Sequence, residues 1–322
     1  MTHDTLRGLV SIGELAERTG VPVRTIRFYC DNGVLESVRS SGGHRLFDSG
    51  RATERLLLVR RLRTLGVGLP AICAVLTGER SLADAVAAER AAVDVELDGL
   101  AWRRASLRAI ENADPAERAA RLELLANVQS GASAYETLVG FWRRVLTPVP
   151  SALFDGFVDM NVPGRLSDPT PEQVVAYAEL VTLVSDREFS LVVSQQLWRS
   201  DPYRIPDRAG LIAGVGEACG MAESALAAGV RPCPGRALDR YVDAHATARA
   251  ARDTPGFRAR LALGCHDTDP RTQRYWQRAG ELMNASTTAG AGQRWLFDAL
   301  ARTTSEPRSD AAPDQAAAAR RS

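Results

Sequence analysis

Six side chains in the first fifty residues carry hydrogen-bond donors or a positive charge suited to nucleic acid. Arginine guanidinium groups bind phosphate oxygens and guanine edges through paired hydrogen bonds, and hydroxyl and imidazole groups bind phosphate oxygens. Four of the six lie close together and two follow in a glycine-containing loop: Arg24, Thr25, Arg27 and Tyr29, then His44 and Arg45. This pattern predicts a DNA-contacting surface built from two parts of the chain.

Two short helices and a turn are predicted to position the first part of this surface. Residues 11–16 form an apolar-periodic segment with an acidic first turn, and the Gly-Val-Pro sequence at 20–22 is typical of a tight turn. A second helix is expected over residues 23–31, where Arg24 and Arg27, three positions apart, share one face. A helix, a tight turn, a basic helix and a basic loop are the parts that lie against a DNA duplex.

Positive charge is concentrated near the amino terminus, although the net charge of the whole chain is only +1. Residues 1–80 hold twelve arginines against eight acidic residues. All 40 basic residues are arginine, for which a GC-rich genome is the simplest explanation. A positive amino-terminal segment, here called the head, on a chain that is otherwise near neutral favours binding of DNA at one discrete surface. It argues against a protein that binds nucleic acid without sequence preference over its whole surface.

The composition also indicates the compartment. The chain has no run of 18 apolar residues and no signal-peptide pattern at its amino terminus, so we expect a cytoplasmic protein with no membrane partner. The cysteines are odd in number and widely scattered, which favours reduced thiols over a disulfide framework. They stand at positions 30, 73, 219, 233 and 265, and the first two are expected in the core.

The head resembles the winged helix-turn-helix domain of the MerR family of transcription regulators. The resemblance covers residues 9–112, and its matches are ordered along the chain. They are Ile-Gly-Glu-Leu-Ala at 12–16, Gly-Val at 20–21, Val-Arg-Thr-Ile-Arg-Phe-Tyr at 23–29, Asn-Gly-Val-Leu at 32–35, Gly-His-Arg-Leu-Phe at 43–47, and a helix pair around 60–66 and 69–72. Two positions depart from the family pattern: Cys30 stands where aspartate is frequent, and Pro22 where serine or threonine is frequent.

The resemblance implies a DNA-binding domain over residues 9–78. The helix with Arg24, Thr25, Arg27 and Tyr29 would lie in the major groove, and the wing with His44 and Arg45 would touch the sugar-phosphate backbone or the minor groove. Phe28 is expected in the core. The resemblance further implies a promoter with a long spacer, which the protein would distort for RNA polymerase at a bending cost of about 1–10 kcal/mol.

Cap residues and breakers predict where the next helices begin and end. Asp48 is expected to cap a helix that runs to about residue 65, a short helix follows over 69–77, and Gly78 ends it. Ser81 then caps a proline-free segment over 81–112, in which apolar residues approximate a coiled-coil seam. The seam consists of Leu82, Val86, Val93, Leu97, Leu100 and Leu107. In the resembling family this helix pairs antiparallel in a homodimer.

Residues 115–302 are predicted to form an all-α domain, which makes the whole chain mostly α. Apolar stripes at helical spacing include one that begins at Val174 and another that begins at Leu211. Most of the many aromatic residues should fill the core, and some are expected to line a pocket for an apolar or aromatic effector. Alternatively, this domain docks another protein and binds no small ligand. Residues 267–282 weakly resemble the drug-binding domain of TipA-like regulators, and 303–322 should form a disordered tail.

We expect no catalytic site, metal or cofactor. Cys265 and His266, with Asp267 and Asp269 beyond them, match no standard zinc spacing. The chain also lacks the glycine-rich phosphate loops and the nucleophile motif of common enzymes. We therefore expect no enzyme fused to the DNA-binding head.

Overall fold

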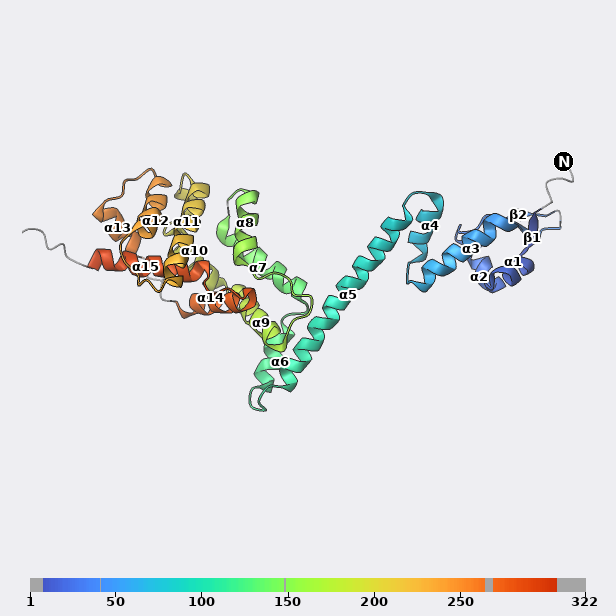
Figure 1. Ribbon diagram of the computed structural model, residues 1–322, viewed down its shortest axis with the longest axis horizontal. Helices are drawn as coiled ribbons and strands as arrows, with labels where there is room; N and C mark the ends of the chain where they lie inside the picture. Colours follow the sequence, from blue (N-terminus) through green and yellow to red (C-terminus); the bar gives the residue numbers. More distant parts are fainter. Residues whose placement is uncertain (1–7, 41, 148, 264–268, 306–322) are drawn as a thin grey trace, which may run out of the picture. The chain divides into compact units, whose positions relative to one another are not determined.

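A computed structural model describes residues 8–40, 42–147, 149–263 and 269–305 (Figure 1). The chain divides between Leu97 and Asp98 into two compact units, a head and a body. Among the described helices, none is both long enough and apolar enough to cross a membrane. The predicted mostly α fold is confirmed, with one small sheet in the head.

The head contains four helices and a three-stranded antiparallel sheet. The sheet order is β1-β3-β2, so the third strand lies in the middle. The elements are β1 (Leu9–Ser11), α1 (Ile12–Thr19), α2 (Val23–Asp31), β2 (Val38–Arg39), β3 (Arg45–Asp48), α3 (Ser49–Thr64) and α4 (Leu69–Thr77). All the predicted helices of this region are confirmed, and the strands β2 and β3 form the predicted wing.

Local capping explains the helix ends. Ser11 accepts a hydrogen bond from the backbone amide of Glu14, whose carboxylate accepts one from the amide of Ser11 at 2.8 Å, a reciprocal cap of α1. Asp48 caps α3 by accepting from the amide of Arg51 at 2.8 Å, as predicted. Gly78 ends α4 with φ near 80°, a conformation that costs glycine little.

The head core has two adjacent apolar clusters. The first joins the sheet to α1 and α2 and includes Leu15, Ile26 and Phe47, each fully buried. The second joins α3 to α4 and includes Val59 and Ile72. Because α2 packs against the first cluster through Ile26, the opposite side of this short helix remains open to solvent.

Helix α5 (Leu82–Glu111) begins in the head and ends in the body. Ser81 caps it by accepting from the amide of Asp84 at 3.0 Å, as predicted. Toward its carboxyl end Ala101, Trp102 and Ala105 are buried, and Trp102 belongs to the body core. The division between the two units therefore falls within the helix.

The body is entirely helical over its described residues, as predicted. In its core α9 packs against α7 and α14, and α11 packs against α12 and α15 (Figure 1). The elements are α6 (Arg118–Ala126), α7 (Gly131–Leu146), α8 (Ser151–Asn161), α9 (Pro171–Ser185), α10 (Arg187–Trp198), η2 (Pro202–Arg204), α11 (Arg208–Ala227), α12 (Arg236–Thr247), α13 (Pro255–Ala262), α14 (Pro270–Met283) and α15 (Ala289–Ser305).

Aromatic side chains fill much of the body core, which confirms the main prediction made for them. The rings of Phe141 and Phe189 stack 5.8 Å apart, and the Trp142 indole donates a hydrogen bond to the hydroxyl of Tyr275 at 2.7 Å. Tyr203 is an exception and is mostly exposed. Helix α15 continues to Ser305, past the predicted start of the tail, and residues 306–322 lie outside the described part.

Candidate nucleic-acid interface and body cavities

Helix α2 presents an exposed face made of Arg24, Arg27 and Phe28. Neither arginine forms an ion pair with any described residue of the chain, so both guanidinium groups are available to an anionic partner. The expectation that Phe28 lies in the core is wrong, since its exposed fraction is 53%. Ile26 and Tyr29 pack on the inner side of α2 and leave the Phe28 ring on the outer side.

Thr25 and Tyr29 lie one turn apart at the border between the exposed and the buried sides of α2. Both are half-buried. The Tyr29 ring packs against both apolar clusters of the head and lies 6.0 Å from the Phe28 ring. Tyr29 thus has a core role, and its predicted contact with phosphate stays a prediction.

The wing is tied to α2 by a charged hydrogen bond. The Arg45 guanidinium on β3 donates to the Asp31 carboxylate at the end of α2, at 2.8 Å. His44 is exposed at the turn of the hairpin, and its amide donates to the Ser40 hydroxyl at 3.1 Å. The structure therefore brings the helix and the wing together, and it assigns Arg45 a positioning contact within the head.

Arg39 is a further basic residue of the wing that our sequence analysis did not single out. It is exposed and pairs across the sheet with Arg45. Among the described residues it has no carboxylate partner. Its place directly opposite a predicted contact residue in the hairpin was the signal that could have identified it.

The body contains a large cavity of about 910 Å³ between α8, α10, α11, α14 and α15. Three of the predicted aromatic residues line it: Trp142, Phe157 and Trp276. Cys219 also lines it; its thiol is buried, and this burial raises its pKa to about 12. The thiol therefore remains protonated and poorly nucleophilic at neutral pH.

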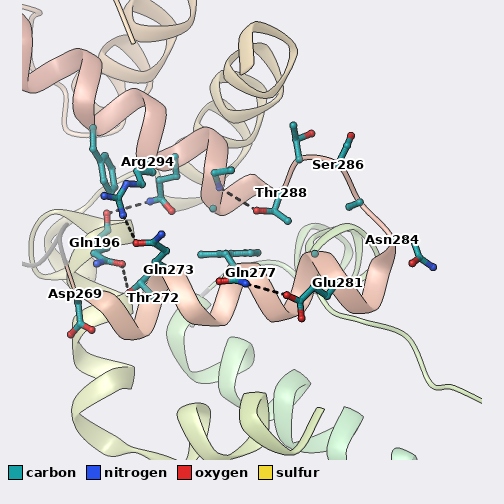
Figure 2. A pocket seen from close by; sticks show the side chains of 18 residues that line it. Gln196, Asp269, Thr272, Gln273, Gln277, Glu281, Asn284, Ser286, Thr288 and Arg294 are labelled. Carbon is teal, nitrogen blue, oxygen red and sulfur yellow. Dashed lines mark hydrogen bonds between the residues drawn. The ribbon is translucent and has the colours of Figure 1, made fainter. Parts of the chain in front are cut away.

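A smaller cavity of about 510 Å³ lies between α14 and α15, and most of the residues that line it are polar or charged (Figure 2). In Figure 2, Gln273 and Gln277 of α14 face Thr288, which directly precedes α15, and Arg294 of α15. The Arg294 guanidinium donates to the Gln273 amide oxygen at 3.1 Å. The two cavities share lining residues, among them Trp276, Thr288 and Gln293.

No group of three or more candidate metal ligands occurs within the described ranges of the chain. Cys265, His266 and Asp267, whose spacing matches no standard zinc site, lie outside those ranges. Cys30 and Cys73 were expected in the core; both are half-buried and pack against the outside of the two head clusters. Burial raises the pKa of the Cys30 thiol.

Comparison with known proteins identifies the head. The sequence model of the MerR HTH family regulatory protein matches residues 10–79. The chain is 46% identical over 74 residues to Nodulation protein NolA of Bradyrhizobium elkanii; the alignment covers 23% of this chain and 33% of that protein. It is 38% identical over 98 residues to Nodulation protein NolA of Bradyrhizobium diazoefficiens; this alignment covers 30% of this chain and 41% of that protein.

Each of these matches covers less than a third of this chain. The aligned segments span about a third to two fifths of the relatives' own length. No solved structure matches the chain. At the amino-terminal end the family match, the two helices and the wing agree with one another, and residues 10–79 form a helix-turn-helix domain of the MerR regulatory family.

Proposed function

We propose that the protein is a sequence-specific transcription regulator of the MerR type that binds promoter DNA as a homodimer. The observation that carries this proposal is the MerR-family head, whose α2 exposes two arginines that have no carboxylate partner among the described residues. Unpaired guanidinium groups on one side of a short helix suit bidentate hydrogen bonds to guanine edges and phosphate oxygens. The relatives that match the head carry the name nodulation protein.

The proposed DNA contacts fall into two groups. Arg24 and Arg27 enter the major groove with α2, and Thr25 and Tyr29 approach the phosphates beside them. His44 lies on the sugar-phosphate backbone, and Arg45 holds the wing against α2 through Asp31 in addition to any contact of its own. Specificity then comes from α2, and the wing supplies the register on the duplex.

The proposed dimer forms through α5. All six residues of the predicted seam are exposed, with exposed fractions from 39% at Val86 to 62% at Leu97. A helix with a row of apolar side chains open to water gains stability when a second helix covers them. An antiparallel pair of α5 helices would place two heads on a pseudo-palindromic site.

The proposed control of transcription depends on DNA shape. The dimer binds a promoter with a long spacer, distorts it, and so allows RNA polymerase to engage both promoter elements. An effector in the large body cavity would bind one of two DNA-bound conformations more tightly and shift their populations. The apolar cavity, with its three aromatic side chains, supports a small-molecule effector over a docked protein.

Genome-wide mapping of DNA bound by the purified protein tests this function. We expect discrete peaks at promoters, with a two-fold symmetric motif inside a spacer longer than usual. Peaks without a symmetric motif would contradict the dimeric, sequence-specific reading. Electrophoretic shift of one recovered site, with and without a scrambled motif, serves as the matched control.

A further inference from the structure

The large body cavity has the size and the walls of a site for a small organic molecule. Its volume of about 910 Å³ lies within the range of ligand-binding clefts. The ring centroid of Trp142 lies 4.8 Å from that of Phe157 and 5.6 Å from that of Trp276. Three neighbouring aromatic side chains therefore form one continuous part of its lining.

These aromatic side chains are held in place by their surroundings. The Trp142 indole nitrogen donates to the buried hydroxyl of Tyr275. The Trp276 indole lies directly against the backbone of Gly290, where an added Cβ would approach to 2.0 Å of the ring. A wall with fixed side chains presents its ring faces to a ligand without a large loss of conformational entropy.

The charge of the cavity is negative. Asp159, Glu217 and Glu223 line it, and among its described lining residues there is no arginine, lysine or histidine. Glu217 is neutralised by Arg240, whose guanidinium donates to it at 2.8 Å. Asp159 and Glu223 form no ion pair with any described residue.

Glu223 is the carboxylate placed deeper in this lining. It is half-buried, whereas Asp159 is exposed. Burial raises the pKa of the Glu223 carboxyl, and a hydrogen bond from the Thr287 side chain partly opposes that rise. A carboxylate removed from water without a cationic partner is destabilised, and a ligand cation would supply that partner.

We propose that the body binds an organic cation, with a flat aromatic or apolar ring system against Trp142, Phe157 and Trp276 and a protonated amine facing Glu223. Indole and phenyl faces attract cations as well as apolar rings, so the wall and the carboxylate select the same class of molecule. This inference rests on the proposed function, in which the same cavity receives the effector.

Three probes that share one ring system and differ in charge test the proposal on the full-length protein. They are 1-pyrenemethylamine, 1-pyrenemethanol and 1-pyrenecarboxylate, and their binding is measured by fluorescence titration. We expect the amine to bind about ten-fold more tightly than the alcohol, and the carboxylate to bind most weakly. The variant Glu223→Gln should bind the amine and the alcohol equally, while Asp155→Asn, an exposed carboxylate outside the cavity, should keep the preference.

The outcomes separate the two proposals. Equal binding of the amine and the alcohol by the unmodified protein, or an undiminished preference in a folded Glu223→Gln variant, overturns the cation assignment and leaves the effector site standing. Failure of all three probes to bind overturns both. Because the comparison of amine with alcohol uses the unmodified protein, it decides the question even if a variant fails to fold.

Discussion

At the scale of single residues, the arginines of the head divide into two kinds. Arg45 and Arg55 form ion pairs with Asp31 and Glu36, at 2.8 and 3.2 Å. Arg24 and Arg27 have no such partner among the described residues. Exposed ion pairs contribute little to stability, but a guanidinium that already bonds a carboxylate has fewer free donors and less net positive charge to offer DNA. The unpaired arginines are therefore the stronger candidates for reading bases.

Replacement of Arg27 by alanine should weaken binding to a recovered operator. If Arg27 contacts a base, the loss is about 1–3 kcal/mol, with relaxed specificity at one position of the site. Fluorescence anisotropy at fixed salt measures it. Arg187→Ala, which removes an exposed arginine of the body, is the control and should leave affinity unchanged. Unchanged binding by the Arg27 variant would show that α2 is placed wrongly on the duplex.

Phe28→Ala should leave the stability of the head nearly unchanged and reduce its affinity for DNA. The side chain is 53% exposed, so its removal leaves no cavity and changes the free energy of unfolding by less than about 1 kcal/mol. Ile26 lies two residues before Phe28, on the opposite, buried side of α2. The variant Ile26→Ala should therefore lower the free energy of unfolding by about 2–5 kcal/mol. Urea denaturation of both variants makes the comparison. Equal destabilisation by the two substitutions would place Phe28 back in the core.

At the scale of elements, α5 carries two different surfaces along one helix. Its apolar seam is exposed, while Trp102 is only 2% exposed and packs at 5.9 Å, edge to face, on the Tyr177 ring of α9. Gly131 at the start of α7 allows this close approach, since a Cβ there would meet the Trp102 ring at 3.1 Å. One side of α5 is thus packed within the chain, and the seam is left exposed for the proposed dimer partner.

Leu97→Glu should convert the proposed dimer into a monomer without unfolding it. The side chain is 62% exposed in the single chain, so glutamate is tolerated there, but burial of two unpaired carboxylates in a dimer seam costs about 2–4 kcal/mol. Light scattering after size exclusion measures the mass. Ala91→Glu, an exposed position elsewhere on α5, carries the same charge and should remain dimeric. A dimeric Leu97→Glu protein would move the interface away from this seam.

At the scale of the whole molecule, head and body have separate cores, and the proposed function gives them separate tasks. The head core consists of its own two clusters, and the body core gathers around the aromatic residues of α7, α10 and α14. Because Trp102 belongs to the body core, a fragment that ends after α5 exposes a large apolar side chain. A test of the isolated head must take this residue into account.

A fragment of residues 1–112 with Trp102→Gln should form a dimer and bind the operator with the affinity of the full-length protein. The proposed DNA contacts and seam all lie within it, and the substitution removes the apolar side chain that the missing body would cover. Anisotropy and light scattering together give the result. A monomeric fragment that binds poorly would place the main dimer interface in the body.

Local signals in the sequence were sufficient for the helix-turn-helix head and for the helical class of the body. The cap residues Asp48 and Ser81 and the terminator Gly78 act where they were expected, since a cap satisfies backbone groups only a few positions away. The apolar stripes beginning at Val174 and Leu211 are buried because helical periodicity is likewise a short-range property.

Tertiary packing decided the remaining features. The exposure of Phe28, the pairing of Arg45 with Asp31 and the burial of Trp102 in the body each depend on residues distant along the chain. The large cavity is of the same kind, since its aromatic wall and Glu223 come from separate helices. Amino-acid spacing specifies which face of a helix or strand is apolar. Which faces then meet depends on how separate elements pack, and this packing formed the cavity in which the protein could hold a ligand.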